Sequence, residues 1–297
     1  MGIHRAGGTP TLPANMSAAG ARERRIGLLT PEQMQRLLEN VARVRTRVAA
    51  ACARAGRAAD SVRMLPVTKY VDVAWIEALR GLGLSELGEN RAQQLAARAA
   101  ALGASRERLP PARPETASAS SPAARQSAAP ASAAPTWHMI GHLQRNKVRP
   151  LLKHCRILHS LDSPRLAHAL EREMADRWPD EAIDALVELN LSGEAGKTGA
   201  ALDQARPLIA AARDCPHVCV RGLMTMAPYD SEPEAARPLF ARLHQTLDAL
   251  RAQNVVGPEC DQLSMGMSGD FEVAIEEGAT IVRIGSILFE GATDLSA

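Results

Sequence analysis

Short apolar runs alternate with helical patterns along most of this chain, and that alternation restricts its fold more than any other feature. Eight runs have the length and composition of buried strands: 64–67, 85–87, 137–140, 157–160, 185–191, 218–223, 262–265 and 280–284. Helical patterns lie between them, among them 73–82, 91–102, 164–177, 202–212 and 232–253. The chain is predicted to be α/β, a single-domain (β/α)8 barrel of the TIM type, with a doubly wound open sheet as the alternative.

A helix over residues 30–56 is expected before the first strand, since Thr30 can cap it and Pro31 suits its first turn. The barrel is expected to cover residues 29–292, and residues 1–28 are expected to form a disordered extension. Residues 104–135 consist largely of Ala, Ser and Pro. Such a segment buries too little surface to offset its ordering entropy, which predicts a flexible insertion within the barrel, away from its C-terminal mouth.

Composition excludes several classes of function. With 297 residues and 46% hydrophobic residues the chain can bury a large core, while a net charge of +2 and 3% aromatics give no sign of a nucleic-acid surface. No apolar run is long enough for a membrane span. The cysteine count is odd, at five, and lacks C-x-x-C pairs, which favours reduced thiols and a cytoplasmic location.

Two Gly-Ser corners follow the last two strand candidates. The first is the stretch Gly266-Met267-Ser268-Gly269, which leads into a helical pattern near Asp270, and the second is Gly285-Ser286. Bare amides, a short hydroxyl side chain and the positive end of a helix hold a phosphate without lysine. β/α barrels carry their phosphate site after strands seven and eight, so the corners predict an anion site.

Two basic side chains stand at strand ends of the same mouth. Lys69 ends the first run, where partial desolvation would favour the neutral amine that a Schiff-base lysine needs; a solvated lysine is the alternative. Arg283 shares a strand face with Gly285, so it points inward if Val282 and Ile284 face the helices. There it would need an acceptor such as a ring nitrogen or phosphate, or else a carboxylate.

Polar residues at other strand ends are less specific. Asn90 and Asn190 can bind a ligand at the mouth, but either can also cap a helix or shape a turn. His138 and His142 are four residues apart in a strand followed by glycine, so no metal site is predicted. The chain lacks G-x-x-x-x-G-K-[ST] and a strand-linked G-x-G-x-x-G, which argues against ATP and dinucleotides.

Together these pieces resemble the pyridoxal phosphate homeostasis proteins (the YggS/PROSC family) from about residue 35 to 291. The matching motifs are Val67-Thr68-Lys69, Gly88-Glu89-Asn90, the run from Trp137 to Lys147, Asn190-Leu191-Ser192, Lys197-Thr198-Gly199, Arg221-Gly222-Leu223-Met224 and the two corners. The long insertion and the N-terminal extension depart from the family pattern without removing any of these motifs.

The resemblance implies an alanine-racemase-type barrel that binds pyridoxal 5′-phosphate. By motif position, Lys69 would form the internal aldimine, Arg283 would face the pyridine nitrogen, and Ser268, Gly285 and Ser286 would hold the phosphate. The remaining expected pocket residues are Asn90, His138, Asn190 and Met224. It also implies a cofactor carrier or regulator in vitamin B6 homeostasis without robust catalysis, acting as a monomer or weak dimer, with pyridoxal-phosphate-dependent apoenzymes as recipients.

The residues themselves agree with weak catalysis. An arginine at the ring nitrogen keeps its protons, which weakens the ring as an electron sink. Racemisation also needs a second acid/base opposite the lysine. Tyr70 is expected to point to the opposite strand face, which leaves Tyr229. The alternatives are therefore a weak racemase or lyase using Lys69 and Tyr229, or a regulatory protein whose surface binds a partner.

Overall fold

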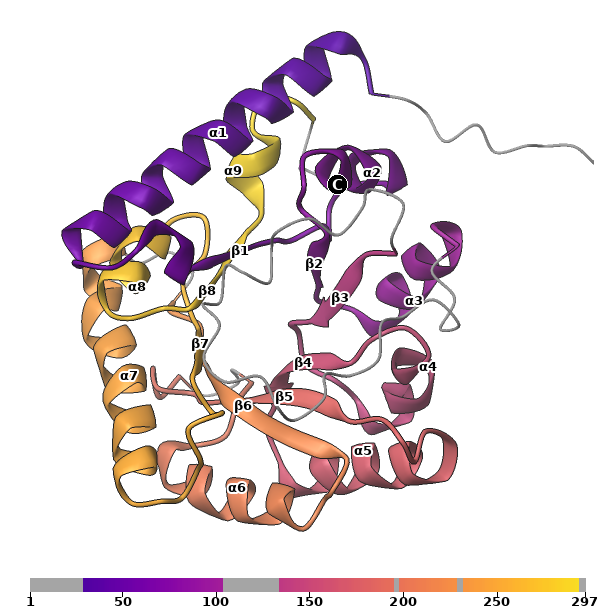
Figure 1. The fold of residues 1–297 in the computed structure, drawn as a ribbon, viewed down its shortest axis with the longest axis vertical. Helices are drawn as coiled ribbons and strands as arrows, with labels where there is room; N and C mark the ends of the chain where they lie inside the picture. The colour runs from indigo at the N-terminus through magenta and orange to yellow at the C-terminus, as the bar shows by residue number, and fades with distance from the viewer. Residues whose placement is uncertain (1–28, 104–133, 195–197, 229–231, 294–297) are drawn as a thin grey trace, which may run out of the picture.

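Eight parallel strands form one sheet that curves into a ring, with the helices outside it (Figure 1). The computed structural model of the protein describes residues 29–103, 134–194, 198–228 and 232–293. The sheet order runs β1-β8-β7-β6-β5-β4-β3-β2, and a bridge between Val67 and Gly88 joins the first strand to the second. The predicted single-domain α/β barrel of the TIM type is confirmed, and the open doubly wound sheet is wrong.

The elements follow the predicted alternation. The strands are β1 (Arg63–Pro66), β2 (Glu86–Glu89), β3 (Thr136–Met139), β4 (Ile157–Leu161), β5 (Ile183–Glu188), β6 (Val218–Met224), β7 (Gln262–Ser264) and β8 (Ile281–Ile284). The α-helices of the described ranges are α1 (Pro31–Arg54), α2 (Val73–Gly81), α3 (Ala92–Ala101), α4 (Val148–Leu152), α5 (Pro164–Arg177), α6 (Ala205–Arg213), α7 (Arg237–Ala252), α8 (Phe271–Glu276) and α9 (Ser286–Phe289). The expected extension 1–28 and all but the last two residues of the expected insertion lie outside the described residues.

Several predicted boundaries differ from the structure by a few residues. The fifth strand ends at Glu188 rather than 191, because the Asn190 N–H bonds to the Ala200 carbonyl and the backbone leaves the sheet. The helices expected at 202 and 232 begin with 3₁₀ turns, Leu202–Gln204 and Pro233–Ala236. At the start of the first helix, Thr30 caps α1 as predicted, and its hydroxyl accepts from the Gln33 N–H.

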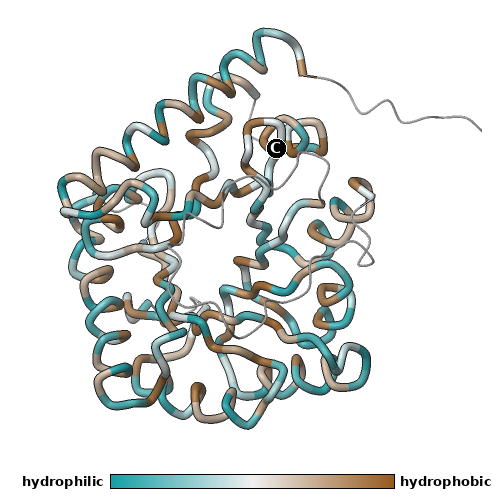
Figure 2. The backbone as a smooth tube through the Cα atoms, viewed as in Figure 1, coloured by the Kyte–Doolittle hydropathy of each residue, from teal (hydrophilic) through white to brown (hydrophobic). Residues whose placement is uncertain are grey.

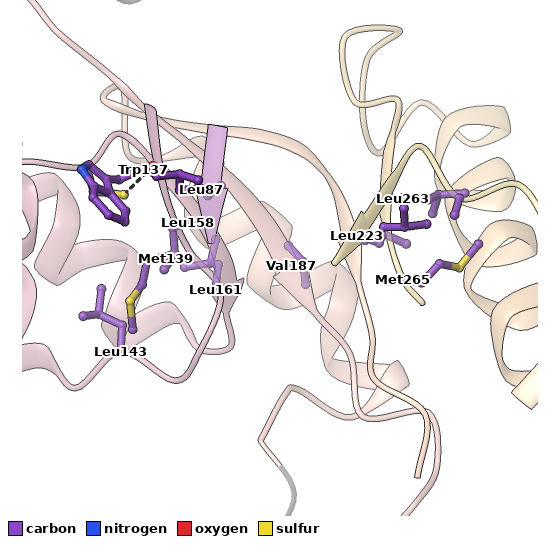
Figure 3. Packing of buried hydrophobic residues seen from close by; sticks show 14 of the residues in the cluster. Leu87, Trp137, Met139, Leu143, Leu158, Leu161, Val187, Leu223, Leu263 and Met265 are labelled. Atoms are coloured by element: carbon purple, nitrogen blue, oxygen red, sulfur yellow. Dashed lines mark hydrogen bonds between the residues drawn. The ribbon is translucent and has the colours of Figure 1, made fainter. Parts of the chain in front are cut away.

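The main core lies between the strands and the surrounding helices. Figure 3 shows side chains of this layer, among them Met139, Leu143 and Leu158. Along the helices, hydrophobic residues recur between hydrophilic ones, as expected when one face of each helix is buried (Figure 2). A smaller apolar cluster of Leu65, Leu186, Met224 and Ile281 lies separate from that layer. Within the described residues, no helix is both long and apolar enough to span a membrane.

The first helix is joined to the end of the chain. α1 lies beside α8 and α9 (Figure 1), and the Asn40 side-chain amide donates to the carbonyls of Leu288 and Glu290 at 3.1 and 2.9 Å. Arg43, Arg47 and Arg54 of the same helix form ion pairs with carboxylates of residues 272–290. The two ends of the barrel sequence therefore meet on one side of the ring.

Candidate functional site

The two Gly-Ser corners adjoin one another at the C-terminal ends of β7 and β8. The Gly285 N–H donates to the Ser268 hydroxyl at 3.1 Å, so one hydrogen bond joins the corners. Ser268 is half-buried and Ser286 is exposed, which leaves both hydroxyls within reach of solvent. A Cβ added to Gly285 would lie 3.6 Å from the Val67 Cβ, so the second corner also borders the residues that follow β1.

Glycine is required at the first corner by its backbone and its surroundings. Gly266 has a φ of +88°, and a Cβ there would lie only 2.5 Å from the Ala274 Cβ of α8. Beyond it the Asp270 carboxylate accepts from the Met267 N–H at 2.5 Å, and the Phe271 N–H donates to the Met267 carbonyl. These bonds fold residues 266–270 into a tight turn, with α8 starting where the sequence predicted a helix.

Lys69 lies in a turn rather than at a strand end. β1 stops at Pro66, Val67 makes only an isolated bridge, and Lys69 and Tyr70 occupy the turn that follows. The expectation that Tyr70 points away on an opposite strand face is wrong, because strand alternation has ended. The Lys69 Nζ lies 4.5 Å from the centre of the Tyr70 ring, a cation–π arrangement at the half-buried lysine.

A buried carboxylate holds the turn that carries Lys69. Glu89, at the end of β2, accepts a 2.6 Å hydrogen bond from the Thr68 hydroxyl. It also forms an ion pair with Arg98 of α3. Arg98 also donates to the Val71 carbonyl at 2.5 Å. Burial raises the pKa of Glu89, and the charge of Arg98 opposes that rise. We call Thr68, Glu89 and Arg98 the turn clasp. In the sequence, Glu89 stands out only as part of the motif Gly88-Glu89-Asn90, which assigns it no role.

Arg283 points into the barrel, as strand alternation predicted. Its side chain is fully buried, donating to the Ser264 hydroxyl at 2.6 Å and to the Thr225 carbonyl at 2.9 Å. Val282 and Ile284 belong to the outer apolar layer. Burial lowers the pKa of Arg283 to about 10, so the guanidinium stays protonated at neutral pH. Both of these partners are neutral oxygens, not the carboxylate of the alternative interpretation.

The two expected asparagines of the pocket, Asn90 and Asn190, have different surroundings. Asn90 lines a hollow of about 210 Å³ with His142 and Lys147, and its buried Oδ1 has no hydrogen-bond partner within the described residues. Asn190 instead shapes its own loop: its Oδ1 accepts from the Ser192 hydroxyl and the Gly193 N–H. The latter is the turn role that sequence reasoning left open.

His138 and Met224 lie inside the barrel. Met224 is buried in the small interior cluster, and His138 is completely buried with its Nδ1 2.9 Å from the Nε2 of His159. His159 was not singled out by the sequence. His142, by contrast, is exposed and contacts Asp162 at 2.9 Å. Across the described ranges, no group of three or more His, Cys, Asp or Glu is placed to hold a metal ion. Tyr229 lies outside the described residues.

Comparison with known sequences gives a consistent result. A family model described as the alanine racemase N-terminal domain matches residues 33–293. The pyridoxal phosphate homeostasis protein of Aquifex aeolicus is 37% identical over 252 residues, which covers 84% of this chain and 96% of that protein. The protein of the same name from Pseudomonas aeruginosa is 33% identical over 264 residues, covering 89% and 99%.

Solved structures share this architecture. PipY of Synechococcus elongatus, solved with PLP bound, has a TM-score of 0.63 at 28% identity, covering 82% of this chain and 99% of its own. A protein of Bifidobacterium adolescentis described as unknown reaches 0.73 at 32% identity, covering 88% and 97%. D-threonine aldolase of Filomicrobium marinum, at 18% identity and 0.60, covers 88% and 61% and shares the fold alone. The chain therefore belongs to the pyridoxal phosphate homeostasis proteins, within the alanine racemase N-terminal domain family.

Proposed function

We propose that this chain binds pyridoxal 5′-phosphate at the C-terminal mouth of the barrel, with Lys69 as the covalent partner of the aldehyde. In this proposal it stores and delivers the cofactor in the cytoplasm, as a monomer or weak dimer, without robust catalytic turnover. The names of the relatives from Aquifex aeolicus and Pseudomonas aeruginosa, and the PLP-bound state of PipY, support the choice of cofactor.

One observation carries the proposal: three neighbouring strands supply three kinds of contact that this cofactor needs. The loop after β7 contributes Ser268, the end of β8 contributes Gly285 and Ser286, and the turn after β1 contributes Lys69. Arg283 lies on β8 just before the second corner. The Oδ1 of Asn90, at the edge of the same mouth, has no hydrogen-bond partner among the described residues and can accept from a ligand group as well.

Each side chain has a distinct task. The corners offer amides and hydroxyls to a phosphate, and Arg283 offers buried N–H donors that stay protonated at neutral pH. Lys69 would hold the aldehyde group, and its amine must lose its proton before it can act as a nucleophile. The cofactor supplies the aldehyde and an electron-accepting ring. An arginine at the ring nitrogen provides no proton, which favours storage over turnover.

The test is trapping with borohydride. We expect purified protein mixed with pyridoxal phosphate to show a visible absorption band, and borohydride to fix the label to the peptide containing Lys69, detected by mass spectrometry. Lys69→Ala should lose both signals, while Lys153→Ala, an exposed lysine after α4, should keep them. A colourless wild-type protein, or label on another lysine, would contradict the proposal.

A second measurement separates storage from catalysis. Loaded protein should reactivate a pyridoxal-phosphate-dependent apoenzyme, and it should not exchange the α-proton of amino acids with solvent at an appreciable rate. Appreciable exchange that is lost in Tyr229→Phe would instead support the racemase alternative. Sedimentation of the loaded protein at several concentrations tests the proposed monomer or weak dimer.

A further inference from the structure

A row of buried polar side chains crosses the barrel interior beneath the proposed cofactor site. It contains one residue from each of β8, β7, β4, β3, β2 and β1: Arg283, Ser264, His159, His138, Glu86 and Arg63. All but Glu86 have exposed fractions of 5% or less. Interior positions of small barrels are ordinarily filled by apolar side chains, so this row is unusual in composition.

Hydrogen bonds connect Arg283 to His138, and ion-pair distances continue the row from His138 to Glu86 and Arg63. Arg283 donates to the Ser264 hydroxyl at 2.6 Å, and Ser264 Oγ lies 2.9 Å from the Nδ1 of His159. The Nε2 of His159 is 2.9 Å from the Nδ1 of His138. At the far end the His138 Nε2 is 3.5 Å from a Glu86 oxygen, which also lies 3.1 Å from the Nε of Arg63.

The Glu86 end of the row sets the direction of the hydrogen bonds within it, provided that both imidazoles are neutral. Arg283 can only donate, so Ser264 accepts from it. The Ser264 hydroxyl then donates to the Nδ1 of His159 when that nitrogen carries no proton. His159 then carries its proton on Nε2 and donates to His138. His138 in turn carries its proton on Nε2, facing the carboxylate of Glu86, which can only accept while ionised. With both imidazoles neutral and the His138 proton facing Glu86, one arrangement of protons satisfies the hydrogen bonds that run from Arg283 to His138.

Both imidazoles are neutral in this arrangement, and their surroundings agree. Burial lowers the pKa of His138, and burial together with the charges of Arg283 and Arg63 lowers the pKa of His159 well below its usual value. The charged groups that act on the pair are Arg63, Glu86, Asp184 and Arg283. A neutral histidine with one donor and one acceptor is what a one-way hydrogen-bond chain needs.

We propose that Ser264, His159 and His138 are positioning residues that connect Arg283 to Glu86 and hold the guanidinium in one orientation toward the bound ring. The inference rests on the proposed function for its ligand, since Arg283 is there assigned to the ring nitrogen. Without His159 the Ser264 hydroxyl is free to rotate, and Arg283 loses the fixed acceptor that aligns it. None of the three touches the cofactor in this proposal.

Two substitutions at one position separate orientation from packing. An asparagine side chain places its oxygen near the position of the histidine Nδ1, so His159→Asn can still accept from Ser264. A glutamine places its amide nitrogen near Nε2, so His159→Gln keeps the link to His138 and loses the acceptor for Ser264. We expect His159→Gln to weaken pyridoxal phosphate binding about tenfold and to shift the visible band, with His159→Asn within about twofold of wild type.

Equal binding by both variants and wild type would overturn the proposal, and so would an equal loss in both, which would indicate packing alone. The unliganded protein gives an independent result. Nitrogen-15 NMR of histidine-labelled wild type should show His138 and His159 as neutral tautomers protonated on Nε2. An Nδ1 proton or an imidazolium at either position would contradict the proposed series of hydrogen bonds. This NMR measurement needs no cofactor. A wild-type protein that fails to bind pyridoxal phosphate would contradict the proposed function, and the NMR result would still test the direction of the hydrogen bonds in the polar row.

Discussion

The barrel interior and the layer outside its strands are built from opposite kinds of side chain. Between strands and helices, aromatic and aliphatic residues such as Trp137, Phe240 and Leu158 are almost completely buried. Inside the ring, buried Arg283, His159 and His138 are connected by hydrogen bonds. Apolar burial stabilises the fold by about 25 cal/mol per Å², whereas a buried polar row gains little beyond its desolvation cost.

This contrast indicates that the two regions have different roles. The outer layer supplies the stability that the interior does not, and the interior holds Arg283 in a fixed and charged state. Substitutions in the outer layer should therefore act mainly on the free energy of unfolding. Substitutions in the polar row and the turn clasp should change ligand binding or pH dependence as well. The following predictions test that difference, beginning with the largest effect.

Phe240→Ala should lower the free energy of unfolding by about 4 kcal/mol, because it leaves a cavity in the outer layer where the ring is completely buried. Chemical denaturation measures this loss. Pyridoxal phosphate affinity, measured by absorbance titration well below the unfolding transition, should stay unchanged. A large loss of affinity in the folded variant would contradict the separation between the two regions.

Glu89→Gln should cost about 3 kcal/mol, since it removes the charge that pairs with Arg98 in the buried turn clasp. It should also slow the reaction of Lys69 with pyridoxal phosphate, followed by stopped-flow absorbance, because Arg98, which also donates to the Val71 carbonyl, loses its charged partner. The control is Glu290→Gln, whose ion pair with Arg43 is exposed and contributes within about 1 kcal/mol. Equal effects of the two variants would argue against the clasp.

The histidines of the polar row should make stability fall in mild acid. Burial lowers their folded-state pKa, so the unfolded chain, with a value of 6.5, takes up protons first as the pH falls. Their contribution is complete above that value and is lost below it, at no more than about 1.4 kcal/mol per pH unit for each group. Denaturation at several pH values should show a shallower loss in His159→Asn than in wild type.

A histidine at the surface should show the opposite sign and a smaller effect. The Nδ1 of His217 lies 2.7 Å from a Glu171 oxygen, and that hydrogen bond raises the pKa of the imidazole. Its stabilisation is present below the unfolded value of 6.5 and is lost as the pH rises through the raised folded value. Glu171→Gln should therefore destabilise the protein by less than about 1 kcal/mol at low pH and by less still at high pH.

The parts predictable from sequence are those that local patterns specify. Alternating apolar runs gave the barrel, strand parity gave the inward direction of Arg283, and glycine next to serine located the two corners. These signals all lie within a few residues. The cofactor roles of these residues remain predictions.

The parts that sequence reasoning missed depend on contacts between distant segments. His159 and Ser264 are 105 residues apart, and the residues next to each in the sequence do not indicate that the two side chains meet. Arg98 is one of many arginines on helical patterns until the fold brings it to Glu89. Tyr70 was misplaced because the strand ends three residues before Lys69, a boundary that periodicity does not resolve.

The contact of α1 with the end of the chain also has a consequence for protein synthesis. Asn40 bonds to carbonyls 248 and 250 residues later, so a ribosome working at its usual rate releases α1 on the order of 10 to 50 seconds before those partners. During that interval α8 and α9, against which α1 packs, have not yet been made. Nascent chains should therefore bind cellular chaperones through this first helix, and release should wait for the last turn of the barrel to emerge.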